Sequence, residues 1–188
     1  IALGEVETRW SGALYGGGFR LEDREGLIRE VRALRTRASP EALFRSFASL
    51  GGERGWLVWN WAWALRGFLD RLLGGPGLRR GRRHPTELLP GEAVDFWRVE
   101  AVEPPRLLRL RAEMRLPGRA WLEWEAREAE GGSLLVQTAY FEPKGLTGFL
   151  YWWALYPIHR RIFSDLARAI VREAEAQAEA PPRGGGAG

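Results

Sequence analysis

Apolar and polar positions alternate most clearly in the second half of the chain. In residues 108–116 every second side chain is apolar and those between are charged, with Leu108, Leu110, Ala112, Met114 and Leu116 set against Arg109, Arg111, Glu113 and Arg115. A period of two places all the apolar side chains on one face of a strand. The pattern therefore predicts an antiparallel sheet with one dry face and one wet face.

Turn residues divide this region into a meander of four strands. The breaks are Pro104-Pro105, Pro117-Gly118 and Gly131-Gly132, which are typical turn sequences. They predict strands over residues 93–103, 106–116, 119–128 and 133–141. A further half-buried strand is predicted at 27–35, well before the meander.

Two helices are predicted between the first strand and the meander. Ser39 followed by Pro40 has the form of an N-cap and a first helical residue, and the double glycine at 51–52 ends that helix. The second helix covers residues 55–73, where one helical face repeats at three- and four-residue spacing. That face consists of Trp61, Leu65, Phe68 and Leu72.

One long helix is predicted over residues 145–178. Its first half is strongly apolar, Pro157 is expected to kink it, and its second half is amphipathic. The amphipathic face carries His159, Ile162, Phe163, Leu166 and Ile170. A sheet with one dry face must be covered, and only this helix has the required length.

The element order predicts an α+β helix-grip domain, in which an antiparallel sheet wraps around a long C-terminal helix. We expect this domain to span residues 25–179. Residues 1–24 are glycine-rich without a clear period, so they predict an irregular extension or linker. Residues 180–188 end in glycines and predict a disordered tail.

Composition narrows the functional classes. The chain has 188 residues, enough for one domain, with ten tryptophans and no cysteine. The missing cysteines exclude disulfides and thiolate metal sites, and no two-histidine metal spacing is present. The net charge of +4 is dispersed among acids, so no nucleic-acid partner is expected. No segment is long enough to span a bilayer, and the cytoplasm is the default location.

Five short motifs resemble those of a known family. They are GLRRGR at 77–82, GEAVDFWRVE at 91–100, VEP at 102–104, LPGRAWLE at 116–123 and FEPKGL at 141–146. With them the chain is similar to the START and polyketide-cyclase-like (SRPBCC) superfamily. It most resembles an uncharacterised bacterial domain family that often follows a short-chain-dehydrogenase-like, NmrA-type NAD(P)-binding domain.

This resemblance implies a cavity between the sheet and the long helix for apolar small molecules. Some superfamily members are cyclases or dehydratases and many only bind, and no catalytic constellation is shared among them. The resemblance also implies a Rossmann-type partner domain. The glycines at 16–18 lack the spacing of a phosphate loop, so this chain is expected to hold no cofactor itself.

The expected cavity would be lined by aromatic and aliphatic side chains of the sheet and the helices. The predicted lining is Trp59, Trp63, Trp97, Leu110, Met114, Leu122, Trp124, Phe149, Trp153 and Tyr156, with polar orientation from Asp95, Arg82 or His159. The tryptophans at 56–63 have three interpretations: a pocket or its mouth, core packing, or a membrane-interface belt.

Each candidate polar residue has two interpretations, one functional and one structural. Asp95 is either a general base or an acid paired with arginine, and His159 is either an acid–base group or a satisfied rim histidine. The basic run around Arg82 either binds an anion or forms ion pairs with Asp95 or Glu92. Three functions thus stay open: a small-molecule binder, an enzyme of the cyclase, dehydratase or isomerase type, and a filled accessory domain beside a Rossmann partner.

Overall fold

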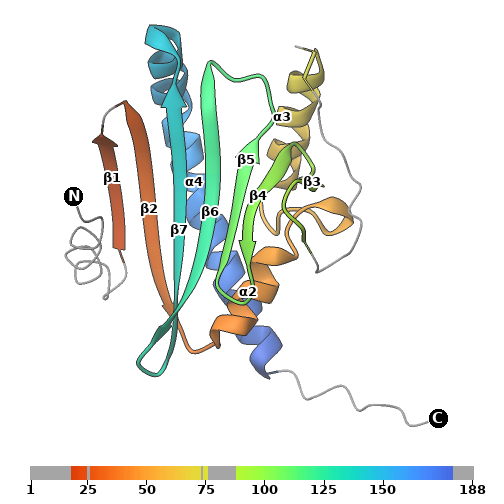
Figure 1. Cartoon of the computed structure of the whole chain (residues 1–188), viewed down its shortest axis with the longest axis vertical. Helices are drawn as coiled ribbons and strands as arrows, with labels where there is room; N and C mark the ends of the chain where they lie inside the picture. Colours follow the sequence, from red (N-terminus) through yellow and green to blue (C-terminus); the bar gives the residue numbers. More distant parts are fainter. Residues whose placement is uncertain (1–17, 25, 73, 76–87, 180–188) are drawn as a thin grey trace.

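The computed structural model describes residues 18–24, 26–72, 74–75 and 88–179. The run around Arg82 and the expected tail at 180–188 lie outside the described residues. A seven-stranded antiparallel sheet in the order β1-β2-β7-β6-β5-β4-β3 forms the body of the fold (Figure 1). Its strands are β1 (Gly18–Arg24), β2 (Leu27–Thr36), β3 (Ala93–Val94), β4 (Trp97–Glu103), β5 (Leu107–Ala112), β6 (Gly118–Ala129) and β7 (Gly132–Pro143).

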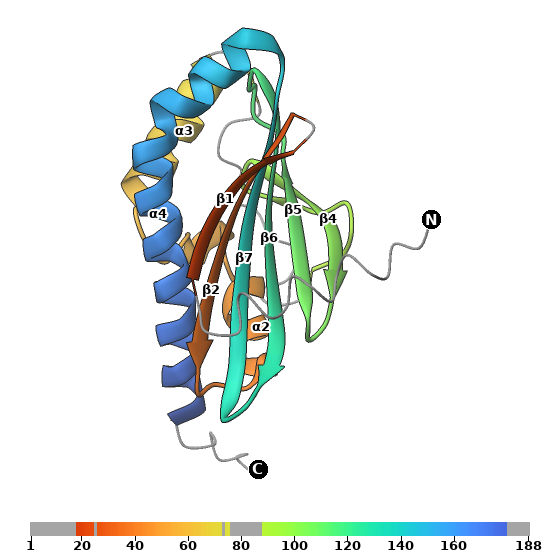
Figure 2. The ribbon, with the colours of Figure 1, turned by 90° about the vertical axis from the view of Figure 1, so that its left-hand side faces the viewer.

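Helices cover one face of this sheet. The long helix α4 (Gly145–Glu179) runs along the whole inner face, while α2 (Pro40–Ala48) lies between the sheet and the lower part of α4 (Figure 2). A short 3-10 helix η1 (Gly52–Arg54) leads towards α3 (Asn60–Leu72), which lies beside the upper end of the sheet. The predicted helix-grip architecture is therefore confirmed.

The main core lies between the inner sheet face, α2 and the C-terminal half of α4. Trp124 and Leu122 of β6 are fully buried there against Phe47 of α2 and Leu166 of α4. The start of α2 follows its prediction, since the Ser39 hydroxyl accepts a hydrogen bond from the Ala42 N–H at 3.3 Å. The apolar alternation read in the sequence thus faces the helices.

Four predicted boundaries are wrong. The strand predicted at 106–116 ends at Ala112 as β5. Residues 18–24 are not irregular but form β1, which pairs along its whole length with β2. The strand predicted at 93–103 is split, because Asp95 has a left-handed φ of 55° and turns the chain between β3 and β4. Helix α3 begins only at Asn60, because Leu57 and Trp59 also have positive φ values of 61° and 54°.

The apolar face predicted for the second helix does not enter the core. Trp61, Leu65, Phe68 and Leu72 are 50–68% exposed, whereas the buried side of α3 carries Trp63, Gly67 and Asp70. The sequence pattern located the helix correctly but not the face that packs. An exposed stripe of this kind indicates a surface with a function of its own.

Helix α4 is one continuous element, as predicted. It continues through Pro157, and its N-terminal part leans over the upper end of the sheet (Figure 2). The predicted amphipathic face is confirmed, since Ile162, Phe163, Leu166 and Ile170 are all buried. None of the described helices contains a stretch long and apolar enough to cross a membrane.

The inner face of β2 carries charge. Glu30 and Arg32 are 0% and 5% exposed and form an ion pair that faces α4. The apolar neighbours Val31 and Ala33 lie instead in a separate cluster with Leu134 and Val136 on the other side of the sheet. In this strand the usual assignment of polar and apolar faces is therefore reversed.

Candidate functional site

A cavity lies inside the upper half of the grip. It is bounded by α3, the inner sheet face and the N-terminal part of α4, and it is lined by Trp63, Arg66, Trp97, Met114, Leu116, Ala120, Trp121, Ala139, Tyr140, Phe141, Tyr151, Trp152, His159 and Phe163. Its enclosed part offers about 70 Å³ to the centres of water molecules, and the whole hollow with its open mouth about 550 Å³. That is room for several waters or a small ligand.

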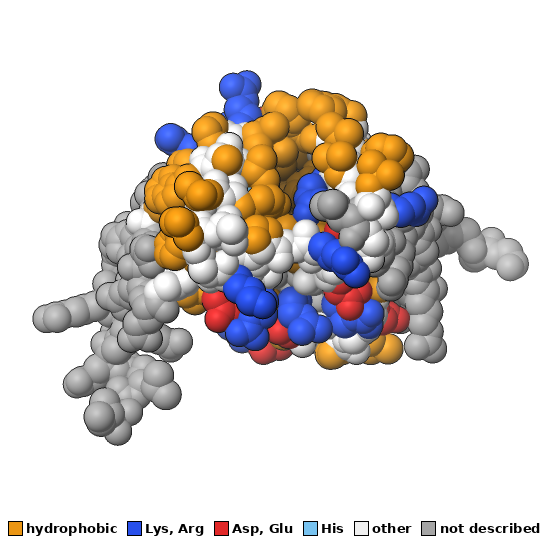
Figure 3. Space-filling view, turned by 90° about the horizontal axis from the view of Figure 1, so that it is seen from above, with side chains coloured by type: hydrophobic (Ala, Val, Ile, Leu, Met, Phe, Trp, Pro, Cys, Tyr) orange, Lys and Arg blue, Asp and Glu red, His pale blue; other side chains and the backbone are white. Residues whose placement is uncertain are grey.

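The mouth opens at the end of the molecule where α3 ends and α4 begins. Seen from above, the surface is hollowed there, with hydrophobic side chains along most of the opening and Lys or Arg side chains at one side of it (Figure 3). Charged side chains gather instead along the edge formed by the outer sheet face. An apolar molecule would therefore meet an apolar entrance.

Stacked aromatic rings build the wall formed by α4 and β7. Trp152 stacks on Phe141 with ring centroids 5.3 Å apart, and its ring centroid lies 6.0 Å from that of His159. His159 in turn stacks on Phe163 at 5.6 Å. Trp152 lies two turns before His159, and Phe163 one turn after it, on one α4 face, so the helix itself aligns them.

Several buried polar atoms around the cavity have no partner. The indole N–H groups of Trp63, Trp97 and Trp152 and the Nδ1 atom of His159 are buried, and no described residue hydrogen bonds to them. A buried polar group without a partner costs about 1–3 kcal/mol. The three indole N–H groups therefore favour ligand atoms that accept hydrogen bonds, while Nδ1 of the neutral His159 can pair with an acceptor or a donor.

The cavity keeps His159 uncharged. Burial, aided by the positive charge of Arg66, lowers the pKa of His159 from 6.5 to about 4. At neutral pH the imidazole is therefore a neutral group that can accept or donate a proton. Among the described residues, no cluster of three or more His, Asp or Glu side chains is arranged to hold a metal ion.

Asp95 lies away from this cavity. Its Oδ2 atom accepts a hydrogen bond from the indole N–H of Trp56 at 2.8 Å, and both side chains are buried. Gly51 packs so closely that a Cβ there would lie 3.1 Å from the same oxygen. The carboxylate thus fixes the tryptophan-rich loop before α3 to the turn between β3 and β4.

Replacing Asp95 by Ala should therefore destabilise the fold by about 2–4 kcal/mol, because Trp56 loses its acceptor and Ala is strained at positive φ. Asp95→Asn keeps an oxygen acceptor and tolerates this backbone conformation, so its cost should be much smaller. Urea unfolding of both variants measures the difference. Equal stabilities of Asp95→Ala and the parent chain would contradict this structural role.

The structure distributes the predicted lining residues unevenly. Trp63, Trp97, Met114 and His159 line the cavity. Leu110, Leu122 and Trp124 are instead fully buried core residues, and Trp59 donates its indole N–H to Asp165 at 2.9 Å. Phe149 packs partly buried beside Trp152 and Phe141, Tyr156 lies near Glu30 and Arg32, and Trp153 points to the surface.

The most important lining residue missed by the sequence reasoning is Trp152. It precedes the exposed Trp153, and the choice between the two depends on the phase of α4. Counting back from Phe163 and His159 in steps of four and seven reaches Trp152, so the confirmed face of the second half held the signal. Leu116 and Tyr151 complete the mouth and were also not predicted.

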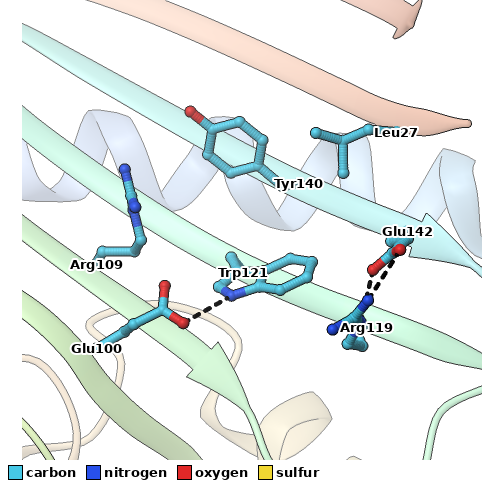
Figure 4. Close-up of a pocket in the computed structure, with 7 residues that line it drawn as sticks. All are labelled: Leu27, Glu100, Arg109, Arg119, Trp121, Tyr140 and Glu142. Carbon is cyan, nitrogen blue, oxygen red and sulfur yellow. Dashed lines mark hydrogen bonds and ion pairs between the residues drawn. The ribbon is translucent and has the colours of Figure 1, made fainter. Parts of the chain in front are cut away.

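A second hollow lies on the outer face of the sheet. It is wider than the inner cavity, with about 560 Å³ for the centres of water molecules and about 1000 Å³ including its open side. Its lining is Leu27, Glu100, Arg109, Arg119, Trp121, Tyr140 and Glu142 (Figure 4). Its polar groups are already paired. Arg119 binds Glu142 at 2.6 Å, and the Trp121 indole donates to Glu100 at 3.3 Å. The named polar side chains of the outer hollow thus already have partners, whereas the inner cavity holds buried N–H groups without one. The inner cavity is therefore the stronger candidate site.

A curved antiparallel sheet closed by one long C-terminal helix defines the helix-grip class of proteins. Within that class, the chain belongs to the family described as "Protein of unknown function (DUF2867)", whose model matches residues 24–166. The comparison with curated proteins found no match.

Solved structures share this fold at low sequence identity. The di-domain ARO/CYC StfQ from the steffimycin biosynthetic pathway is similar with a TM-score of 0.50 and 12% identity, over 82% of this chain and 52% of that one. A protein from Rhodobacter sphaeroides gives a TM-score of 0.49 and 15% identity over 85% and 99%. An Arabidopsis thaliana member of the major latex protein family gives 0.49 and 14% over 82% and 98%.

Proposed function

We propose that the chain binds a small apolar or amphipathic molecule in the cavity between the sheet and α4. The observation that carries this proposal is the set of unpartnered buried donors on Trp63, Trp97 and Trp152, which line an otherwise aromatic and aliphatic cavity. Such a site favours a ligand with a flat apolar body and one or more oxygen acceptors. Carbonyl or ether oxygens meet this requirement.

The enclosed volume limits the size of the ligand. About 70 Å³ for water centres suits a compact ring system, and a larger ligand would extend into the mouth between α3 and α4. Met114 and Leu116 from the loop before β6 line the cavity and are partly exposed, as side chains at its open side would be. The entrance is therefore built from side chains that can change rotamer without moving the sheet.

Native mass spectrometry of the purified chain tests for a bound small molecule directly. Thermal unfolding with small aromatic ketones then measures stabilisation, which should rise with ligand concentration. Met114→Trp would fill the mouth and is expected to abolish this stabilisation, whereas Leu89→Trp adds the same bulk at an exposed site outside the lining. The proposal would be wrong if the mass spectrum showed only the ligand-free chain and no such compound stabilised the parent chain.

The second candidate is an enzyme of the cyclase, dehydratase or isomerase type. The observation that favours it is the neutral His159, whose Nδ1 has no described partner and whose ring lies in the cavity wall. StfQ, which has the same fold, is described as an ARO/CYC. Of the two acid–base residues predicted from the sequence, only His159 lines the cavity, so the proposed base is His159 and not Asp95.

Ligand affinity and turnover separate the two candidates. His159→Gln keeps a polar side chain of similar size but removes proton transfer. A binder keeps its affinity in this variant, whereas an enzyme keeps affinity and loses turnover. The third hypothesis, an accessory domain beside a Rossmann NAD(P)-binding partner, predicts neither stabilisation nor turnover for this chain alone.

A further inference from the structure

Two helices expose large apolar side chains at the cavity mouth. Three come from the end of α3 and three from the beginning of α4, and they are 45–74% exposed: Phe68, Leu69, Leu72, Leu146, Leu150 and Trp153. We call these six residues the apolar rim. Figure 3 shows hydrophobic side chains along most of the opening at this end of the molecule. A contiguous apolar patch of this kind marks an interaction surface.

The charges carried by the rim helices are one-sided. Arg66 and Arg71 lie on α3, and the acid of this helix, Asp70, is fully buried and accepts a hydrogen bond from the Arg115 backbone N–H. Lys144 directly precedes α4, and the first acidic residue of that helix is Asp165, nearly six turns further on. The exposed charges on these two segments are therefore basic.

The apolar rim and the basic residues beside it indicate which kind of partner could bind this surface. In a symmetric dimer the rim of a second copy would bring the same basic side chains of both copies together, which opposes association. A negatively charged lipid surface instead pairs with the basic residues and accepts the apolar side chains. Trp153 suits such an interface, because an indole has an apolar body and a polar N–H group.

We propose that the apolar rim docks this chain on an anionic lipid surface, with the cavity mouth facing the lipid. The rim residues enter the interface from the ends of two helices without spanning the membrane. The mouth then opens onto acyl chains, so an apolar ligand exchanges between lipid and cavity without passing through water. This docking is independent of which ligand the cavity holds.

Cosedimentation with lipid vesicles tests the proposal. The chain should bind vesicles of phosphatidylcholine with a minority of phosphatidylglycerol about tenfold more tightly than pure phosphatidylcholine, and added salt should weaken the binding. Phe68→Glu or Leu150→Glu should each weaken it about tenfold, since each places a carboxylate where an apolar side chain enters the lipid. Ala176→Glu adds the same charge at an exposed position near the other end of α4 and should leave binding unchanged.

Two further measurements keep the outcomes distinct. Met114→Trp fills the cavity mouth but leaves the rim in place, so it should retain vesicle binding even where ligand binding is lost. Sedimentation equilibrium of the same variants reports the oligomeric state. Absence of binding to anionic vesicles overturns the proposal, and self-association that Phe68→Glu abolishes would identify the rim as an interface between copies instead.

Discussion

Arg32→Met should destabilise the fold by about 3–5 kcal/mol, because it leaves the carboxylate of Glu30 buried without its counter-ion. The guanidinium of Arg32 contacts Glu30, donates from Nε to the Ser164 hydroxyl at 3.0 Å and donates from Nη2 to the Arg160 carbonyl at 3.0 Å. It thus joins β2 to the middle of α4. Urea unfolding at neutral pH measures the loss.

The pH dependence of that loss provides a second readout. Burial raises the pKa of Glu30 even with Arg32 present, and removal of Arg32 raises it further. A carboxyl whose folded pKa lies above its unfolded pKa favours folding at acidic pH and opposes it as the pH rises through that window. The destabilisation by Arg32→Met should therefore shrink as the pH is lowered towards the pKa of Glu30.

Two variants control this experiment. Removing both charges with Glu30→Leu and Arg32→Met together should recover most of the lost stability, since a buried ion pair is often replaceable by apolar packing. Arg127→Met removes an exposed arginine from the outer sheet face and should change stability by less than about 0.5 kcal/mol. If the double variant were as unstable as Arg32→Met alone, the loss of stability would come from lost packing and not from the unpaired charge of Glu30.

Stability should also fall by up to about 3 kcal/mol between pH 6.5 and 4 because of His159 alone. Its pKa is lowered from 6.5 to about 4 in the folded chain by burial and by Arg66. Above pH 6.5 the imidazole is neutral in both the folded and the unfolded state. As the pH falls through this window, His159 binds a proton in the unfolded chain but not in the folded chain. The free energy of unfolding therefore decreases.

The measurement is the difference between two pH profiles of unfolding free energy. His159→Gln cannot titrate, so its profile should lack the part of the decline due to His159. The chain has one other histidine, so His84→Gln is the matched control, which removes one imidazole and leaves His159 in place. Parallel profiles for the parent chain and His159→Gln would mean that His159 protonates normally in the folded state.

The sequence predicted the architecture well because the strongest patterns were local. The alternation in residues 108–116 and the turn sequences around it identified the meander, and the length of the last helix identified what covers it. The break at Asp95 could not be predicted, because a left-handed residue inside a strand pattern is favoured only by tertiary contacts. Here the buried hydrogen bond from Trp56 stabilises that turn.

The candidate site was harder to predict than the fold. On α3 the apolar stripe led away from the site, since the cavity is lined by Trp63 and Arg66 from the other face. An apolar helix face predicts packing in the core only where that face does not serve as an interaction surface. On α4, extending the confirmed second-half phase through Pro157 would have selected Trp152 over Trp153.

Charge on the inner face of β2 escaped prediction for a different reason. The alternation of Glu30, Val31, Arg32 and Ala33 predicts that the charged face of the strand is exposed to solvent. The structure instead places this charged face against α4. Two opposite charges two residues apart lie on the same strand face and can neutralise each other. Only the neighbours from α4 show that this face is the interior.

Pro157 divides α4 into parts with unequal attachments. Proline lacks an N–H, so the helical ladder misses one hydrogen bond where the helix leaves the main core. Beyond it Leu166 and Ile170 anchor the helix fully, while the part before it carries exposed Leu150 and Trp153 and the mouth residue Tyr151. The segment over the entrance is therefore held to the sheet mainly by Trp152 stacked on Phe141, so the closure of the cavity at this end depends on one aromatic contact.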